Sequence, residues 1–591
     1  MSSDVNNVRG MPIGAMHHLN DKVGLWEELT SLKQQHTDLA WCFCGDFNAV
    51  RRVDERKGIR GSSSQRKEIE DFNRLIEYNG LLDIPLVGKK YTWFKANCTA
   101  KSRLDRILVS EEWIQIWPAS KQYVQPRMVS DHCALVVKAR LKNWGPRPFR
   151  SLDTWLMEPN FKNMVKEKWD AYHVQGDRMS NLKDKLKLLK ADLKVWNKDT
   201  FGCLETNKKR IVSEIEELYG KDDINGLDGI GSKRRMELLS ELGLVDKKLK
   251  SIYRQKARVN LCKYGDTNSK FYHSAIIWRR LRNEVKGVEI ESQWCEEPEV
   301  VRREAKSVFE NRFKATQDYG VTMGSMEFKS LSMEASRKMI TSFTEEEVKD
   351  AVWQCGGSKS PGPDGFNFNF IKQCWDVLKT DIMEAVRFFH TTGSFSKGCN
   401  AFFIALVPKV RDPSSLEHFR PISLVGAVYK IITKVLSLRM KEVMSDVIDD
   451  CQSAFLSNRG LLDSVVMANE VLEECTRNQR SGVCFKVDFE KAYDSVRWSF
   501  LFDMLRRLGF HEKWILWVKG YLALSSVSVL VNGSPMEEFR PCRGLRPGDP
   551  LAPFLFLVVA EGLAGLVRQA LSMEVLRGIK VGSNGIECCL L

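Results

Sequence analysis

The sequence predicts a multidomain α/β and α+β protein. At 591 residues, the length suggests about four domain-sized units, and 43% hydrophobic residues are enough to build cores. Three patterns then divide the chain. Short apolar segments that end in polar residues fill residues 1–140, leucines at three- and four-residue steps fill residues 141–340, and strand and helix periods alternate over residues 341–591. We therefore expect a strand-rich first domain, a helical linker and a mixed last domain.

The bulk composition points to an intracellular nucleic-acid binder. The net charge of +14 favours a polyanionic partner, and no basic amphipathic N-terminal helix or lipidation motif suggests a membrane. The 16 cysteines include no CxxC and no His/Cys cluster at zinc-ligand spacing, which indicates a reducing compartment, nucleus and cytoplasm. The N-terminus lacks a secretory pattern, and the most apolar run, residues 551–567, contains Pro553 and Glu561 and is predicted to be a buried helix. The sequence leaves the oligomeric state open.

The first 140 residues place polar side chains beside short strands. The apolar segment 41–44 runs into Gly-Asp-Phe-Asn, and later segments end in Arg-Leu-Asp-Arg and Ser-Asp-His. Strand ends commonly display catalytic carboxylates, and phosphodiester hydrolysis needs a carboxylate to orient water and a divalent metal. The candidate residues are Asp46, Asn48, Asp105, Asp131 and His132. Taken singly, each has a plainer reading as an ordinary turn residue or a surface histidine.

The middle of the chain is helical. Apolar stripes at helical spacing over residues 182–196, 211–218 and 238–252 predict an antiparallel helical pair or coiled coil with a loop at residues 220–231. Residues 254–282 combine basic and aromatic side chains. This combination could bind RNA by stacking and phosphate contacts, or it could be a solvated face.

The last part contains the central candidate. Val483, Phe485 and Val487 alternate with polar residues, so Asp488 is expected at the end of a strand, before a helix that ends near Gly509. A metal-binding role competes here with a helix-capping role.

Further local signals lie on either side of Asp488. Thr344 to Glu347 has the capping-box pattern, and Val527 to Val531 leads into the hairpin dipeptide Asn532-Gly533. A strand over residues 402–407 ends just before Lys409, and Arg420 follows a polar turn. The two cations could clamp a triphosphate or be exposed hairpin residues.

Several ordered motifs resemble the reverse transcriptases of plant LINE-type (non-LTR) retrotransposons. The matching segments are Lys359-Ser-Pro-Gly-Pro-Asp-Gly365, Ile404-Ala-Leu-Val-Pro-Lys409, Phe419-Arg-Pro-Ile-Ser-Leu424, Gln452-Ser-Ala-Phe455, the segment around Asp488, Val531-Asn-Gly533 and Arg543-Gly-Leu-Arg-Pro-Gly-Asp-Pro-Leu551.

This resemblance implies a right-hand fold with fingers and palm, and RNA-templated DNA synthesis. Asp488 would be the first carboxylate of a two-metal site that takes Mg²⁺ or Mn²⁺, and Lys409 and Arg420 would hold the phosphates of a deoxynucleoside triphosphate. Tyr493 would be the aromatic gate beneath the sugar. RNA template and target DNA are the implied partners.

The order of the N-terminal motifs resembles the second half of an apurinic/apyrimidinic-type endonuclease domain, of the endonuclease/exonuclease/phosphatase family. By this resemblance, Asp46 and Asn48 orient the water and the scissile phosphate, Asp131 holds His132 against the phosphate, and Asp105 supports a metal site that also takes Mg²⁺ or Mn²⁺.

Three departures from the two families predict that this chain is catalytically incomplete. Only about 45 residues precede the Gly-Asp-Phe-Asn motif, so the first half of the β-sandwich and its metal-binding glutamate are not found. Pro547 stands where the polymerase family has glutamine, and the paired aspartates of that family are not found by Leu591. We therefore expect a partial sandwich, an incomplete reverse transcriptase fold and an inactive, truncated copy. The alternative is a nucleic-acid-binding remnant without catalysis.

Overall fold

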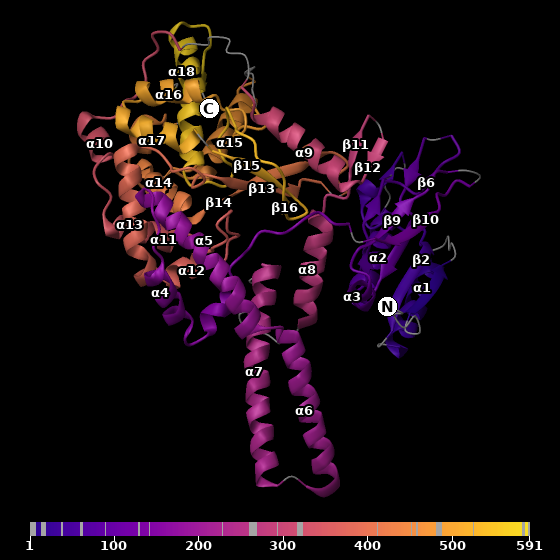
Figure 1. Cartoon of the computed structure of the whole chain (residues 1–591). Coiled ribbons are helices and arrows are strands. Elements are labelled where there is room, and N and C mark those ends of the chain that lie inside the picture. Colours follow the sequence, from indigo (N-terminus) through magenta and orange to yellow (C-terminus); the bar gives the residue numbers. More distant parts are fainter. Residues whose placement is uncertain are drawn as a thin grey trace. The chain divides into compact units, whose positions relative to one another are not determined.

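The computed structural model divides into two compact units, each described by itself. The first contains Met1–Gly145, Val259–Glu304 and Val407–Arg420, and the second contains Pro146–Arg258, Ala305–Leu406 and Pro421–Leu591. The structure describes residues 8–13, 19–36, 39–58, 63–88, 90–97, 99–127, 130–140, 142–226, 228–258, 269–291, 293–315, 323–410, 412–450, 452–456, 459–479, 487–523, 525–581 and 586–588. Figure 1 follows the chain through both units.

The predicted linker, residues 141–340, is not a unit of its own. Its helices through Arg258 cluster with the second unit, whereas its described residues between 269 and 304 cluster with the first. The physical reason is burial: Leu182, Leu186 and Leu189 of α5 (Arg178–Trp196) are buried, and α5 packs along α13 (Trp375–Thr392) of the same unit.

The first unit is built on small sheets. Its main sheet has the order β1-β2-β8-β4, a second has the order β10-β9-β5, and a third has the order β3-β7-β6. Its elements are β1 (Val8–Ile13), α1 (Leu19–Gln35), β2 (Ala40–Asp46), β3 (Arg56–Lys57), α2 (Ser63–Tyr78), β4 (Leu82–Asp83), β5 (Leu86–Val87), β6 (Trp93–Phe94), β7 (Lys101–Ser102), β8 (Asp105–Val109), α3 (Glu111–Ile116), β9 (Ser120–Val124), β10 (Leu135–Ala139), α8 (Ser269–Asn283), β11 (Val288–Ile290) and β12 (Gln293–Cys295).

Strand β2 shows why the main sheet is layered. Its side chains alternate, so Trp41 and Phe43 face a core shared with Trp26 of α1 and Phe72 of α2. Cys42 on the opposite face joins a core with residues of β8 and α3, against which β10 packs. Helices α1 and α2 thus cover one face of the main sheet, and α3 and the second sheet pack on the other.

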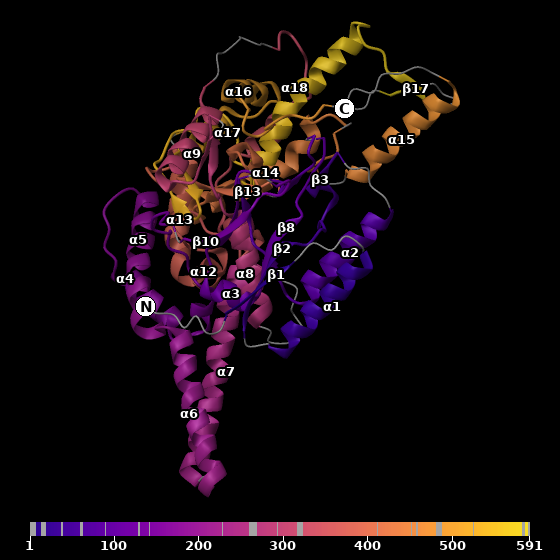
Figure 2. The ribbon, with the colours of Figure 1, turned by 90° about the vertical axis from the view of Figure 1, so that its right-hand side faces the viewer.

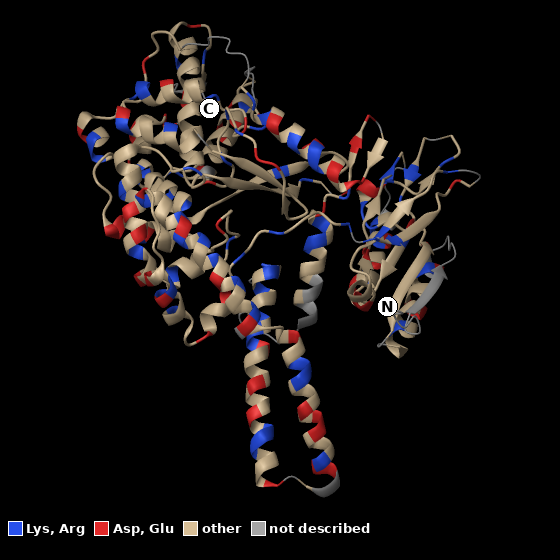
Figure 3. Cartoon of the chain, viewed as in Figure 1, with Lys and Arg blue, Asp and Glu red and all other residues tan. Residues whose placement is uncertain are grey.

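In the second unit, α6 (Leu204–Asn225) and α7 (Gly229–Ala257) form the predicted antiparallel helical pair, visible in Figures 1 and 2. Ile211 and Ile215 of α6 pack with Leu238, Val245 and Leu249 of α7, while Lys, Arg, Asp and Glu are mixed along the outer faces (Figure 3). The connection is shorter than the predicted loop at residues 220–231, because α6 continues to Asn225. Asp228 then caps α7 by accepting a hydrogen bond from the Gly231 N–H at 2.6 Å.

The rest of the second unit surrounds a sheet with the order β14-β13-β15-β16, in which β13 and β15 are parallel and Phe402 pairs with Val527. Asn532 and Gly533 have φ values of 51° and 87°, which confirms the predicted hairpin turn between β15 and β16. The remaining elements are α4 (Phe161–Ala171), α10 (Met333–Lys338), α11 (Glu345–Gln354), α12 (Phe368–Gln373), β13 (Phe402–Pro408), β14 (Phe419–Val425), α14 (Ala427–Val447), α15 (Leu461–Arg477), α16 (Trp498–Arg507), α17 (Glu512–Leu522), β15 (Val527–Val531), β16 (Ser534–Pro535), α18 (Ala552–Ser572), β17 (Ile579–Val581) and β18 (Ile586–Cys588), and α9 (Pro298–Phe313) begins in the first unit.

Helix α18 is long and apolar enough to cross a membrane by length and composition, a property that the core helices of soluble proteins share. Here Leu555, Val558 and Glu561 are buried. The Glu561 carboxylate pairs with Arg568 at 2.8 Å and accepts the Asp449 N–H at 3.0 Å, so its charge is satisfied within the unit. Burial of these residues agrees with the predicted core helix.

Candidate active sites

In the first unit, the sheet register brings two predicted carboxylates together. Asp46, the last residue of β2, lies opposite Asp105, the first residue of β8. An isolated antiparallel β-bridge between Trp93 and His132 places the histidine next to these two carboxylates. The ligand atoms of Asp46, Asp105 and His132 all lie within 4.8 Å of one another.

Hydrogen bonds fix the orientation of this group. His132 Nδ1 lies 2.9 Å from an Asp105 carboxylate oxygen, and His132 Nε2 lies 3.9 Å from Asp46. The Asn48 N–H donates to the other Asp46 oxygen at 2.8 Å, from a turn in which Asn48 has a φ of 46°. The buried Thr92 hydroxyl oxygen accepts hydrogen bonds from the backbone N–H groups of Leu104 and Asp105, each at 3.0 Å. The role of Thr92 was missed from sequence, although it lies in a short segment, Tyr91-Thr-Trp93, of the kind that frames the site.

The partner of His132 differs from the one expected. Asp131, predicted to hold the histidine, is exposed and accepts a hydrogen bond from the Trp93 indole N–H at 2.8 Å instead. Adjacent residues of an extended segment point to opposite sides, so Asp131 and His132 cannot both face the site. Asp105 therefore takes the place that the resemblance gave to Asp131.

The pKa values of Asp105 and His132 are both raised, which suits a proton shared between the two side chains. Burial raises the pKa of Asp105 above its ordinary value. Burial alone would lower the pKa of His132, but its hydrogen bond with Asp105 and the neighbouring carboxylate charges outweigh this effect and raise it. The indole of Trp93 lowers the pKa of the exposed Asp131. The hydrogen-bonded Asp105 and His132 remain a coupled acid and base.

A buried ion-pair network anchors β8 next to Asp105. Arg106 is fully buried and pairs with Asp83 at 2.6 Å and with Glu55, while Arg103 pairs with Asp83 at 2.8 Å. These charges compensate one another, and removal of one partner would leave an unpaired buried charge. Sequence reasoning did not predict this buried network.

In the second unit, Asp488 is an exposed residue in an irregular segment. The predicted strand before it lies largely in residues 481–486, outside the described residues. Helix α16 begins at Trp498 with Arg497 as its N-cap, so Asp488 does not cap that helix. The prediction that Asp488 could serve only as a helix cap is therefore wrong.

Tyr493 lies in the turn that follows. Its ring is half-buried and packs on Phe556 with a centroid separation of 5.2 Å, and burial raises its pKa. Its carbonyl accepts the Leu545 N–H at 2.7 Å, and the Val496 carbonyl accepts the Gly544 N–H at 2.7 Å. The loop 543–550 is thus docked onto the segment that carries Asp488 and Tyr493.

The same loop contains residues that sequence reasoning missed. Arg546 is buried, with its guanidinium 4.2 Å from the Tyr429 ring centroid and 4.6 Å from that of Phe402, and it donates to the Tyr521 carbonyl at 3.1 Å. The carbonyl of Pro547 accepts the Ser423 N–H at 3.0 Å. The loop therefore connects the sheet and the core helices of this unit.

Lys409 and Arg420 are both exposed residues at the end of the β13–β14 hairpin, where the Lys409 N–H donates to the His418 carbonyl at 2.7 Å. They lie in Val407–Arg420, which clusters with the first unit, whereas Asp488 and Tyr493 belong to the second. Their joint action on a triphosphate stays a prediction.

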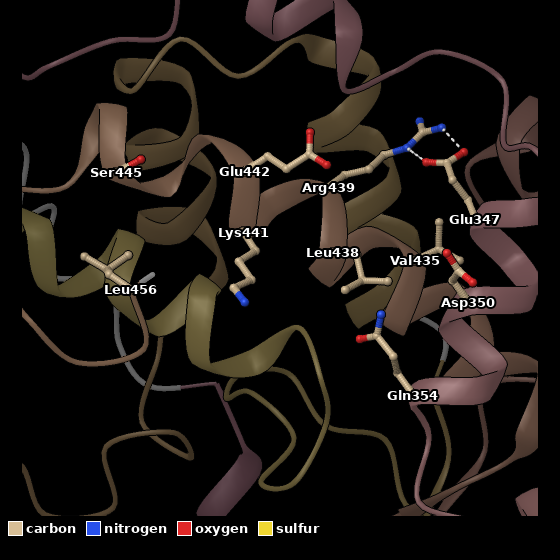
Figure 4. A pocket seen from close by; sticks show the side chains of 10 residues that line it. All are labelled: Glu347, Asp350, Gln354, Val435, Leu438, Arg439, Lys441, Glu442, Ser445 and Leu456. Atoms are coloured by element: carbon tan, nitrogen blue, oxygen red, sulfur yellow. Dashed lines mark hydrogen bonds and ion pairs between the residues drawn. The ribbon is translucent and has the colours of Figure 1, made fainter. Parts of the chain in front are cut away.

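A cavity of about 520 Å³ in the second unit contains none of the predicted site residues. Figure 4 shows that it is lined by side chains of α11 and α14 and by Leu456. Arg439 on its wall is held by both Glu347 oxygens, at 2.8 and 2.9 Å, and by the Thr341 carbonyl at 2.6 Å. This arginine serves to join the two helices.

Comparison with known proteins supports the polymerase resemblance. Residues 407–583 match the family described as reverse transcriptase (RNA-dependent DNA polymerase). The transposon TX1 uncharacterized 149 kDa protein of Xenopus laevis is 24% identical over 92% of this chain and 42% of that protein. The Pol polyprotein of the type-2 retrotransposable element R2DM of Drosophila melanogaster is 27% identical over 38% of the chain and 20% of its own length.

A third relative is the probable RNA-directed DNA polymerase from transposon BS of Drosophila melanogaster, 24% identical over 43% of the chain and 28% of that protein. The chain thus spans less than half the length of each of these relatives. Since the family match covers Asp488, Tyr493 and the loop 543–550, this chain carries the reverse transcriptase domain of a non-LTR, LINE-like retrotransposon.

Proposed function

We propose that the chain is part of an RNA-directed DNA polymerase that copies an RNA template from a nicked DNA target with deoxynucleoside triphosphates. The observation that carries this proposal is the family match over residues 407–583, in which the loop 543–550 is hydrogen-bonded to the segment of Asp488 and Tyr493. Tyr493 would lie beneath the incoming sugar, and Lys409 and Arg420 would bind the phosphates.

The residues present suit Mg²⁺ or Mn²⁺ in part. Asp488 is exposed and offers a carboxylate oxygen, the ligand type that these ions prefer. Two such ions would activate the primer hydroxyl and neutralise the triphosphate. Within the described residues, the one group of three potential metal ligands includes Asp46 and not Asp488. We therefore propose that this chain alone is an inactive polymerase.

A graft tests the polymerase proposal. The chain is extended at its C-terminus with the segment that follows the aligned region in the Xenopus laevis relative, and primer extension on an RNA template is measured with Mg²⁺. Extension by the graft that is lost in Asp488→Asn supports the proposal. A graft whose extension survives Asp488→Asn contradicts it, and the matched control Asp503→Asn, a half-buried aspartate paired with Arg507, should change little.

A second candidate function is phosphodiester hydrolysis in the first unit, favoured by the grouping of Asp46, Asp105 and His132. Asp46 and Asn48 would orient water and phosphate, and Asp105 would hold the His132 imidazole so that Nε2 faces the phosphate. The carboxylate of Asp46 suits a divalent ion as well.

Binding of Mn²⁺ tests the hydrolase candidate without requiring turnover. Paramagnetic Mn²⁺ should broaden the imidazole NMR signals of His132 well before those of the exposed His173 of the second unit, and Asp46→Asn should remove the difference. Equal broadening of both histidines would eliminate this metal site.

A further inference from the structure

The segment Val407–Arg420 of the first unit connects β13 to β14 and carries Lys409 and Arg420 near its two ends. We call its described residues the hairpin tip. Lys409 and Arg420 are exposed, and neither forms an ion pair within the part of the chain that the structure describes. The positions of these two cations therefore depend on how the hairpin tip itself is held.

A buried lysine holds the hairpin tip at Asp412. Lys286 lies between α8 and β11, is 5% exposed and forms an ion pair with one carboxylate oxygen of Asp412. The Lys286 ammonium also donates a hydrogen bond to the Leu86 carbonyl of β5 at 3.2 Å. Among the described residues, Asp412 is the one carboxylate that pairs with Lys286. The buried ammonium therefore depends on the hairpin tip for its counter-charge.

Two further contacts attach the hairpin tip to the same unit. Arg103 Nη1 lies 3.8 Å from the other Asp412 oxygen, and Arg103 also pairs with Asp83 at 2.8 Å. Asp412 thus extends the buried ion-pair network beside β8. The Glu289 N–H of β11 donates to the Ser414 carbonyl at 3.3 Å. The hairpin tip is therefore held at two residues, through a charged side chain and through the backbone.

The pKa shifts agree with this anchoring. Burial lowers the pKa of Lys286, and the charge and hydrogen bond of Asp412 oppose that effect. Burial alone would raise the pKa of Asp412, but the charges of Lys286 and Arg103 outweigh it and lower the pKa. Lys286 and Asp412 each favour the charged form of the other. A neutral side chain at position 412 would leave the Lys286 ammonium without its counter-charge.

The backbone transmits the anchor to both cations. The Lys409 N–H donates to the His418 carbonyl at 2.7 Å, so the two arms of the hairpin tip are joined at the level of Lys409. Asp412 lies in the turn between these arms, with a φ of 50°, a left-handed value that aspartate adopts more readily than most residues. An anchor at the turn therefore restricts both arms together.

We propose that Asp412 is a positioning residue, which fixes the hairpin tip on the first unit and thereby orders Lys409 and Arg420 for a triphosphate. A cation that is already held in place loses less conformational freedom when it binds a phosphate. The anchoring follows from contacts within the first unit, whereas its use in nucleotide binding rests on the proposed function of Lys409 and Arg420.

Hydrogen exchange of the full chain, followed by mass spectrometry, tests the anchoring. Asp412→Asn keeps the shape of the side chain and removes its charge. Exchange in the hairpin tip should become at least about tenfold faster, since a hydrogen bond to a charged group contributes more than one factor of ten. The matched control is Glu284→Gln, which takes the carboxylate from Lys121, another lysine of the first unit that is 5% exposed. It should leave exchange in the hairpin tip unchanged.

A double-variant cycle shows whether Asp412 acts through Lys286. Lys286→Met fills the buried space without a charge, so this variant leaves no unpaired ammonium and stays informative if Asp412→Asn does not fold. Either single change should speed exchange in the hairpin tip, and the double variant should add little to the larger single effect. Unchanged exchange in Lys286→Met, or fully additive effects, would overturn the anchor.

Affinity of the full chain for a fluorescent deoxynucleoside triphosphate tests the positioning. If the ordered hairpin tip falls to a tenth of the population, Asp412→Asn should weaken binding about tenfold. The benchmark is the double variant Lys409→Gln, Arg420→Gln. A benchmark that weakens binding while Asp412→Asn binds like the native chain would overturn the positioning role and leave the proposed function standing. A benchmark that binds like the native chain would overturn the proposed role of the two cations, and the positioning role with it.

Discussion

Asp105 sets the protonation of His132 in the first unit. The two side chains are in direct contact at 2.9 Å, whereas Asp131 is directed to Trp93. The protonated imidazole is therefore bound more strongly in the folded protein than in the unfolded chain. Its contribution to stability is fully present below the unfolded histidine pKa of about 6.5 and is lost as pH rises through the raised folded pKa.

We predict that Asp105→Asn lowers the pKa of His132 to below its ordinary value. Burial of the imidazole remains in the variant, while the carboxylate that outweighs it is removed. The measurement is an NMR titration of the His132 imidazole.

Asp131→Asn is the matched control for this titration and should shift the His132 pKa far less, since Asp131 is exposed and is the weakest of the charges that raise it. A larger shift in the control than in Asp105→Asn would restore Asp131 as the histidine's partner.

At the scale of elements, the loop 543–550 depends on a glycine. Gly544 has a φ of 87°, and a Cβ there would lie 2.8 Å from the Asp494 carbonyl oxygen. Gly533 in the β15–β16 turn has the same φ of 87° but no atom nearer than 3.7 Å to such a Cβ. A comparison of alanine substitutions at the two positions therefore distinguishes the cost of the left-handed backbone from the cost of the close contact between Gly544 and Asp494.

We predict that Gly533→Ala costs about 1–2 kcal/mol, the cost of a left-handed conformation for a residue with a Cβ. Gly544→Ala should cost about 1–3 kcal/mol more, because the loop must also move away from the segment of Tyr493. Thermal unfolding followed by circular dichroism compares the two. Equal losses would mean that the loop is not packed as tightly as the hydrogen bonds of Leu545 and Gly544 suggest.

At the scale of the whole molecule, positive charge is distributed over both units. The basic stretch 254–282, predicted as one nucleic-acid surface, is divided: residues through Arg258 cluster with the second unit, residues 259–268 lie outside the described residues, and Arg279, Arg280 and Arg282 of α8 are exposed in the first. The role of this basic stretch in binding nucleic acid stays a prediction.

Replacing Arg279, Arg280 and Arg282 with alanine should flatten the salt slope for single-stranded RNA by about two, if all three contact phosphates. The control is Arg74→Ala with Arg477→Ala, two exposed arginines that already pair with Asp71 and Glu473. A triple variant with an unchanged slope would leave these charges as a solvated helix face.

The sequence by itself determined features whose partners lie close along the chain. The Thr344 and Glu347 capping box forms both of its hydrogen bonds, the Asn532-Gly533 turn and the apolar stripes of α6 and α7 form as predicted, and α16 stops before Gly509 with its φ of 77°. These features depend on local hydrogen bonds and on helical or strand period, which a few neighbouring residues fix.

Tertiary structure decided which distant residues meet. Asp105 takes His132 because the β2–β8 register and the Trp93 bridge converge there, and Arg546 is buried because three rings from separate elements surround it. The division of the predicted linker between the two units likewise depends on the path of the chain. Contacts between residues far apart in sequence depend on how whole elements pack, and no local pattern encodes that choice.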